Sequence, residues 1–132
     1  MGAAMIALLD TCTFLWLAFE PGRISPAARR VLDDPTVVRA LSQVSVLEIV
    51  LKYRIGKLPL PLPPDRWIPS RRGFFQLEDF PMTESVLFRS GLLPAGHDDP
   101  FDRLLAAHAI ESGSTLLSPD TPLSLLGASR IW

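Results

Sequence analysis

The chain has 132 residues, of which 48% are hydrophobic and 20% are charged, and its formal net charge at pH 7 is −1. These values exclude a disordered chain and a strongly basic surface, and the length predicts a single domain over residues 1–132, with residues 1–4 as a loose N-terminal extension. No apolar run approaches the roughly 18–20 residues that a membrane span requires, so we expect no membrane association.

The N-terminal part of the chain alternates between strand and helix patterns. Residues 5–9 form a short apolar run, which predicts a buried strand that ends just before Asp10. A helix over 13–19 is plausible after that strand, and 25–34 opens with a Ser-Pro pair that favours a helix start. Residues 36–44 contain β-branched side chains in partial alternation, which predicts a second strand.

The clearest predicted helix covers residues 45–58. Ser45 and Glu48 stand in the S-x-x-E relation of a capping box, and apolar side chains recur at helical spacing. Gly56 supplies a left-handed stop, and the prolines within 59–64 then predict an extended connector.

The C-terminal half continues the same alternation, although the pattern assigns no element to residues 65–72. The predicted elements are a strand over 73–80, a helix over 83–91, a helix over 101–113, a strand over 114–118, a brief helix over 121–127 and a terminal strand over 128–132. Strands that alternate with helices predict an α/β fold, here a three-layer α/β/α sandwich with a mostly parallel sheet.

The stretch "GHDDPFDRLLAAHA" (96–109) places three aspartates just before an apolar helix. With Asp99 as the N-cap, Pro100 falls at the first helical position and Asp102 at the third, where a carboxylate favours the positive end of the helix dipole. The usual N-cap and first-turn residues of a helix therefore explain this stretch as well as an active site does. The choice between these two interpretations depends on the other acidic residues.

Four acidic residues fall where an α/β fold gathers ligands. Asp10 and Asp120 follow predicted strands, whereas Glu48 and Asp102 lie in predicted first helical turns, so all four can converge at the carboxyl edge of the sheet. Clustered carboxylates repel one another, and a divalent cation that prefers oxygen ligands, such as Mg²⁺ or Mn²⁺, removes this conflict. Such a site points to phosphate-ester chemistry, although each acid alone also has a structural explanation.

Four segments carry a resemblance to a known family. "LLDTCTFLW" (8–16), "SVLEIVLKYRIGKL" (45–58), "LLPAGHDDPFDRLLAAHA" (92–109) and "TLLSPD" (115–120) occur in the order typical of PIN-domain proteins, and they resemble VapC toxins of bacterial toxin–antitoxin pairs most. The resemblance implies an α/β/α sandwich, metal-dependent endoribonuclease activity on RNA, and a small antitoxin protein as partner. Cys12 is the only cysteine and forms no internal disulfide, which agrees with the cytoplasmic location of such a toxin.

The resemblance also assigns roles to the acidic residues. It implies that Asp10, Glu48, Asp102 and Asp120 are the catalytic, metal-binding quartet, that Asp99 is a cap, and that Asp98 is an exposed loop acid. The family commonly has Thr and then a polar or basic residue before the last acid, whereas this chain has Ser118 and Pro119, which removes a backbone donor beside Asp120.

Several further residues have open roles. Thr11 and Ser118 are candidates to bind a carboxylate, a metal-bound water or substrate, or to act structurally at strand ends. Lys52 and Arg103 are candidates for RNA phosphate contacts, or else solvated or capping charges. We interpret His97 and His108 as structural or surface residues, and the three tryptophans as packing residues: Trp16, Trp67 and Trp132.

Two expectations concern partners and rivals. The apolar regions 13–35 and 47–68 are expected to supply a homodimer face or a groove for an antitoxin helix. A phosphoryl-transfer receiver module would need a lysine after a late strand, and no lysine follows Lys57. A catalytically weak or inactive PIN-fold binding module is the other alternative.

Overall fold

The computed structural model describes residues 4–132, so residues 1–3 of the predicted extension over 1–4 lie outside the described residues. In chain order the elements are β1 (Ile6–Leu9), α1 (Thr11–Phe19), the 3-10 turn η1 (Pro21–Arg23), α2 (Pro26–Asp33), β2 (Val38–Ser42), α3 (Gln43–Arg54), α4 (Pro64–Phe74), β3 (Glu78–Phe80), α5 (Glu84–Leu92), α6 (Pro100–Ser112), β4 (Thr115–Leu117), α7 (Pro122–Leu125) and β5 (Arg130–Ile131).

The strands form one sheet in the order β3-β2-β1-β4-β5, and every pairing within it is parallel. The central strand is β1, whose Leu8 lies opposite Ala40 on β2 and Leu116 on β4. Because the strands are parallel, their carboxyl ends share one edge, where the loops after β1 and β4 come together.

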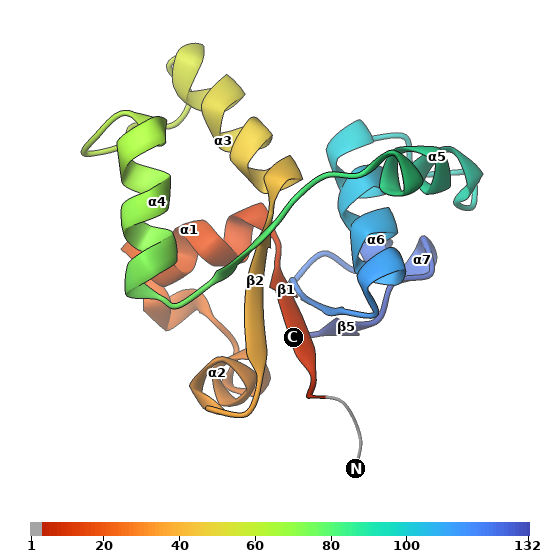
Figure 1. Cartoon of the computed structure of the whole chain (residues 1–132), viewed down its shortest axis with the longest axis horizontal. Coiled ribbons are helices and arrows are strands. Elements are labelled where there is room, and N and C mark those ends of the chain that lie inside the picture. Colours follow the sequence, from red (N-terminus) through yellow and green to blue (C-terminus); the bar gives the residue numbers. More distant parts are fainter. Residues whose placement is uncertain (1–3) are drawn as a thin grey trace.

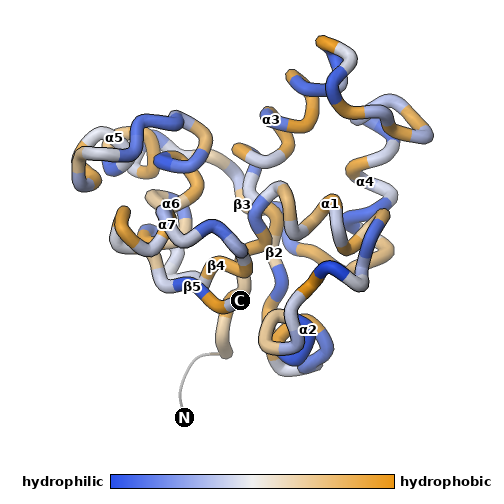
Figure 2. The backbone as a smooth tube through the Cα atoms, turned by 180° about the vertical axis from the view of Figure 1, so that it is seen from behind, coloured by the Kyte–Doolittle hydropathy of each residue, from blue (hydrophilic) through white to orange (hydrophobic). Residues whose placement is uncertain are grey.

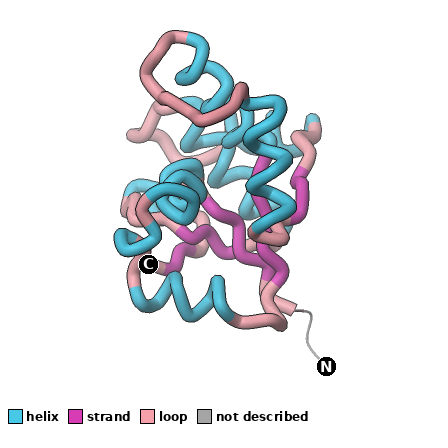
Figure 3. The backbone as a smooth tube through the Cα atoms, turned by 90° about the vertical axis from the view of Figure 1, so that its left-hand side faces the viewer, coloured by secondary structure: helices cyan, strands magenta, loops and turns pink. Residues whose placement is uncertain are grey.

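Helices cover both faces of this sheet. The strand alternation separates the two cores: Leu9 packs with α1, α2 and α4, whereas the adjacent Leu8 packs with α6 and α7. Figure 1 shows the first group of helices on one side of β1 and β2 and α5–α7 on the other, and Figure 3 shows the strands running between helices. The predicted three-layer sandwich is confirmed.

Hydropathy follows this layering. The strand β4 appears largely hydrophobic in the backbone trace, whereas β2 and β5 include hydrophilic segments and α2 carries a clearly hydrophilic run (Figure 2). Within residues 4–132, no helix combines the length and the hydrophobicity that crossing a bilayer demands.

The boundary between β2 and α3 differs from the prediction. The predicted strand over 36–44 ends at Ser42, and α3 begins at Gln43 because the Ser42 hydroxyl accepts the backbone N–H of Val44 at 3.1 Å. The predicted Ser45–Glu48 capping box is therefore wrong: the Ser45 hydroxyl is buried without a hydrogen-bond partner in the described chain. Glu48 consequently lies in the second turn of α3 rather than in the first.

The predicted strand over 73–80 is also too long. Its first part belongs to α4, which opens with Pro64 at the first helical position and contains Pro69 in its interior. Trp67 and Ile68 are buried in the core, so tertiary packing stabilises α4 despite the interior proline. Only Glu78–Phe80 pair with the sheet, as β3.

The residues that begin and end helices α6 and α1 lie close to where the sequence predicts them. Asp99 caps α6 by accepting the N–H groups of Phe101 and Asp102, and Gly113 ends the helix in the left-handed region at φ 65°. Helix α1 begins at Thr11, two residues earlier than predicted, because Asp10 acts as its N-cap.

Candidate active site

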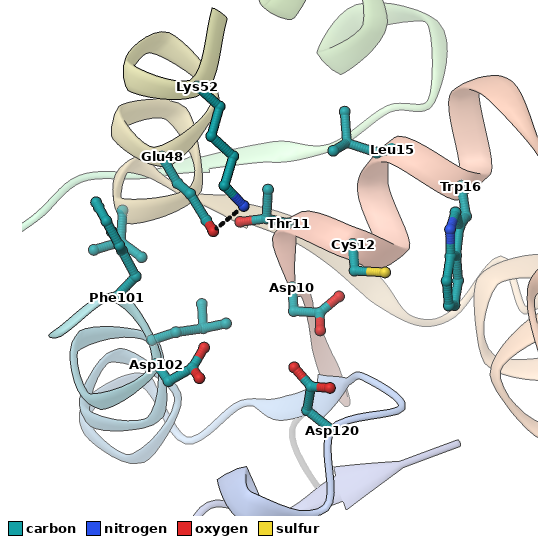
Figure 4. Close-up of a pocket in the computed structure, with 12 residues that line it drawn as sticks. Asp10, Thr11, Cys12, Leu15, Trp16, Glu48, Lys52, Phe101, Asp102 and Asp120 are labelled. Atoms are coloured by element: carbon teal, nitrogen blue, oxygen red, sulfur yellow. Dashed lines mark hydrogen bonds and ion pairs between the residues drawn. The ribbon is translucent and has the colours of Figure 1, made fainter. Parts of the chain in front are cut away.

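A pocket of about 290 Å³ lies where the carboxyl ends of β1 and β4 meet α3 and α6. The residues that line it are Asp10, Thr11, Cys12, Leu15, Trp16, Val44, Glu48, Lys52, Phe101, Asp102, Leu105 and Asp120. The structure thus brings all four predicted acidic residues to one pocket. Figure 4 shows the carboxylates of Asp10, Asp102 and Asp120 around a common space, with Glu48 on its far side.

Asp10 is the most enclosed of these acids, with 4% of its surface exposed. Its Oδ1 accepts the backbone N–H of Thr13 at 2.7 Å, and its Oδ2 accepts the Ser118 hydroxyl at 2.5 Å. Burial raises the pKa of Asp10 above its ordinary value, and the charge of Asp120 adds to this, whereas the two hydrogen bonds oppose it. The carboxylate is therefore fixed in orientation, and its negative charge is costly until a cation compensates it.

Asp102 lies in the first turn of α6, with 31% of its side chain exposed. Because Asp99 already caps the helix, the Asp102 carboxylate is not used for capping and faces the pocket. Its Oδ2 lies 2.8 Å from Nε2 of His97. Burial raises the pKa of Asp102, and the hydrogen bond from His97 lowers it in part.

His97 is the residue of this site that sequence reasoning missed. It was interpreted as a structural or surface residue, but it is half-buried in the loop before α6 and contacts Asp102 directly. A spacing of five residues across a loop has no characteristic pattern, so the sequence offered no signal for this contact. His108 does have the structural role expected for it: its Nδ1 lies 2.8 Å from the buried Ser42 hydroxyl.

Glu48 enters the pocket from α3 and forms an ion pair with Lys52. The Lys52 ammonium lies 2.8 Å from Oε2 of Glu48, one helical turn further along α3 (Figure 4). Lys52 itself lines the pocket and is exposed, so a cation predicted to contact RNA phosphate lies beside the acidic residues. The pair is easily exchanged, because ion pairs at exposed positions contribute little net energy.

Asp120 is exposed in the loop after β4, and the residues before it hold that loop to the site. The backbone N–H of Asp120 donates to the Ser118 hydroxyl at 3.0 Å. This bond uses the amide of Asp120, not the amide that Pro119 lacks. Asp120 thus reaches the pocket with Pro119 before it.

Ser118 and Arg103 have other partners than substrate. Ser118 is fully buried and does not line the pocket. Its hydroxyl donates to Asp10 and accepts the backbone N–H of Asp120. The Arg103 guanidinium is directed away from the pocket, toward main-chain carbonyl oxygens of Ser90, Leu93, Pro94 and His97. In this structure both side chains are thus engaged by the chain itself, while Thr11 lines the pocket in a buried position.

Cys12 lines the pocket but is not a nucleophile. Burial, together with the negative charges of Asp10 and Asp120, raises the pKa of the Cys12 thiol to about 11. The thiol is therefore protonated at neutral pH, and the protonated form is the unreactive one.

The donor set of the pocket fits a hard divalent cation. Four carboxylates supply oxygen ligands, and two of them, Asp10 and Asp102, have pKa values raised by burial. Among residues 4–132, no three carboxylate, imidazole or thiol groups are already drawn together as a closed metal centre. In this structure Glu48 is paired with Lys52, and Asp102 with His97.

The fold and the pocket together define an α/β/α protein with an acidic site at the carboxyl edge of a parallel sheet. The family model of the PIN domain matches residues 7–127, so the chain belongs to the PIN-domain family.

Comparisons with individual proteins agree with this assignment. Ribonuclease VapC22 of Mycobacterium tuberculosis (strain ATCC 25618 / H37Rv) is 29% identical over 117 residues, which cover 88% of each chain. Among solved structures, VapBC2 from Rickettsia felis, bound to a DNA fragment of its promoter, has a TM-score of 0.66 at 16% identity over 96% of this chain and 98% of that chain. VapBC-1 from nontypeable Haemophilus influenzae has a TM-score of 0.64 at 18% identity, covering 96% and 97% of the two chains. These two structural likenesses establish the fold alone.

Proposed function

We propose that this chain is a divalent-metal-dependent endoribonuclease and the toxin of a toxin–antitoxin pair. The observation that carries the proposal is the convergence of Asp10, Glu48, Asp102 and Asp120 on one pocket of a PIN domain. The similarity to a protein named a ribonuclease, and to structures named as VapBC assemblies, supports both parts of it.

The metal site would be formed by the four carboxylates, with Mg²⁺ or Mn²⁺ as the ion. Such an ion supplies positive charge that offsets the charge developing on a phosphodiester, and it acidifies a water molecule. Asp10 is held rigidly by Thr13 and Ser118, so its oxygens keep a fixed direction toward the ion. His97 gives Asp102 the same kind of support.

The reaction is hydrolysis of an RNA phosphodiester. The oxygen of a water molecule would form the new bond to phosphorus while the bond from phosphorus to one ribose oxygen breaks. A carboxylate of the site would accept a proton of the attacking water, and the departing ribose oxygen would take a proton from solvent water. We assign a phosphate contact to Lys52, and the position of its exposed ammonium at the pocket beside Glu48 supports this. With a net charge of −1, the chain depends on such local cations for RNA affinity.

The partner proteins would cover apolar surface outside the pocket. Exposed apolar side chains lie on α3 and the following connector, including Leu47, Val50, Ile55 and Leu62. We assign this face to a helix of the cognate antitoxin, which would bury it in a groove. A second exposed set on α5, with Phe88 and Leu92, is our candidate for homodimer contact.

Cleavage of a mixed RNA pool by antitoxin-free protein tests the enzymatic proposal. We expect cleavage with Mg²⁺ or Mn²⁺, none with EDTA, and a loss of at least about 100-fold for Asp102→Asn. The asparagine keeps an oxygen to accept the hydrogen bond from His97, so the variant should fold. Asp98→Asn is the matched control, because Asp98 is an exposed acid of the same loop that does not line the pocket.

Metal titration separates the alternatives. If folded protein binds metal but cuts no RNA in the pool, it is not a general ribonuclease, and a nuclease that acts on a narrow class of RNA is the remaining form of the proposal. Folded protein that neither binds metal nor cuts would instead favour a PIN-fold binding module without catalysis.

A further inference from the structure

One wall of the pocket is aromatic. Trp16 lies one helical turn after Cys12 on α1, and both side chains line the pocket together with Asp10, the cap of the same helix. At 1.5 Å per residue, Trp16 is displaced by about 9 Å from Asp10 along the helix axis. Figure 4 shows the indole at the end of the pocket, beyond Cys12 as seen from Asp10.

The neighbours of Trp16 leave part of its ring free. The Arg23 guanidinium lies over the ring with its carbon 4.3 Å from the ring centroid, and the Trp132 ring is tilted by 48° with its centroid at 5.8 Å. Trp16 is nevertheless only partly buried, and the remaining surface forms the pocket wall. Trp67 differs, because it is buried in the core against Phe14.

Arg23 adds a cation to this wall. Its Nη1 donates to Glu20 at 3.1 Å, and within residues 4–132 its guanidinium makes no other hydrogen bond. Both side chains of this ion pair are more than half exposed, so the pair is weak and the guanidinium can donate to a phosphate oxygen instead. An aromatic surface and an adjacent phosphate-binding cation are the two features by which proteins hold a single-stranded nucleotide.

We infer that Trp16 and Arg23 form a nucleotide subsite, in which Trp16 stacks on a base next to the cleaved bond and Arg23 binds the phosphate of that nucleotide. The inference rests on the proposed nuclease function and deepens it, because it states how the RNA strand enters the acidic site. The strand passes along α1 with its base on the indole. Stacking of this kind tolerates every base, so the subsite binds single-stranded RNA rather than one sequence.

Equilibrium binding in the absence of cleavage tests the subsite. The protein carries Asp102→Asn and is kept in EDTA at low salt, and the two probes are labelled hexauridylate and an abasic ribose-phosphate hexamer of equal charge. Trp16→Leu keeps apolar bulk but removes the aromatic face, and Trp16→Phe restores an aromatic ring. Phe74→Leu is the matched control, because Phe74 is 69% exposed on α4, also lies beneath an arginine, and does not line the pocket.

We expect Trp16→Leu to weaken hexauridylate binding about 10-fold, within the range for loss of one stacked base, and to leave the abasic probe unchanged. Trp16→Phe should recover most of the loss. Arg23→Gln should weaken the binding of both probes equally, and the slope of log affinity against log salt concentration should fall by about one, as expected for one lost phosphate contact. Equal losses on both probes for Trp16→Leu would show a structural role and overturn the inference. If the unsubstituted chain cuts RNA while its Asp102→Asn form shows no preference for bases, the subsite fails and the nuclease stands. If the unsubstituted chain neither binds nor cuts RNA, both the subsite and the proposed nuclease function are contradicted.

Discussion

The Ser118 hydroxyl donates to Oδ2 of Asp10 at 2.5 Å across 108 residues of sequence. The Ser118 hydroxyl oxygen also accepts the backbone N–H of Asp120 at 3.0 Å. One buried serine thereby fixes two acids that reach the pocket from the ends of adjacent strands, β1 and β4. Its role is to position these acids rather than to contact substrate.

Removing this hydroxyl should therefore weaken both the fold and the metal site. For Ser118→Ala we expect the free energy of unfolding at pH 7 to fall by about 1–3 kcal/mol, because a buried carboxylate loses a donor. Affinity for Mn²⁺ should fall about 10–100-fold, the usual cost of losing support to a ligand. Urea unfolding and calorimetric Mn²⁺ titration measure the two effects. Ser129→Ala, at an exposed serine just before β5, is the control, and an Mn²⁺ affinity equal in both variants would contradict the positioning role.

Local chemistry explains what could be predicted of this fold. Asp99, Pro100 and Gly113 bound α6 by rules that act within a few residues, so that helix was predicted closely. The acids after β1 and β4 could be predicted to meet because apolar runs marked two strands and parallel strands share an edge.

The features that were predicted wrongly have two causes: two nearby residues compete for one local role, or the deciding contact joins residues that no local rule connects. Ser42 and Ser45, three positions apart, are both of a residue type that favours N-caps, and the sheet decides between them, because β2 pairs with β3 as far as Ser42. The helix α4 depends on the burial of Trp67 and Ile68, which no local rule supplies. The contact of His97 with Asp102 depends on the path of a loop, which sequence spacing does not determine.

The pairing of His97 with Asp102 makes a second prediction. His97→Ala removes the donor to Oδ2 of Asp102, and we expect RNA cleavage and Mn²⁺ affinity each to fall about 10–100-fold. Stability should change by less than about 1 kcal/mol, because both side chains are partly exposed. Metal titration, single-turnover cleavage and urea unfolding check these three values. If cleavage by His97→Ala matches that of the Asp98→Asn control, the hydrogen bond has no part in the reaction.

The pKa of Asp10 predicts how stability without metal depends on pH. Burial raises this pKa above its unfolded value of 3.8, so the group contributes stability below pH 3.8 that is lost as pH rises through the folded pKa. In EDTA at pH 7, Asp10→Asn should therefore be at least as stable as the natural chain, since asparagine still caps α1. Added Mg²⁺ should raise the melting temperature of the natural chain and not that of the variant.

Asp34 provides a control, because its pKa is shifted in the direction opposite to that of Asp10. The pKa of Asp34 is lowered by hydrogen bonds from Thr36, so its contribution is present above pH 3.8 and is lost as pH falls through the folded pKa. Asp34→Asn should thus lose stability relative to the natural chain at pH 7. Thermal unfolding of the three proteins between pH 3 and pH 8 gives the comparison, and a destabilised Asp10→Asn at pH 7 in EDTA would refute the assigned sign.

Arg103 provides the last prediction, because its guanidinium binds the loop that carries His97. It donates five hydrogen bonds, to the carbonyl oxygens of Ser90, Leu93, Pro94 and His97. For Arg103→Ala we expect a loss of about 2–4 kcal/mol in the free energy of unfolding, since several carbonyls lose a charged donor at once.

Arg103→Lys should recover little of this loss, because an ammonium lacks the planar fork that reaches several carbonyls. In contrast, Arg54→Ala, at an exposed arginine in the last turn of α3, should change stability by less than about 0.5 kcal/mol. Urea unfolding of the three variants checks these values. The affinity of Arg103→Ala for hexauridylate, measured where that variant is folded, decides between the two roles considered for Arg103, because alanine removes the positive charge that lysine would keep. An unchanged affinity fits a structural residue, whereas a large loss in a stable variant would restore the phosphate contact expected from the sequence.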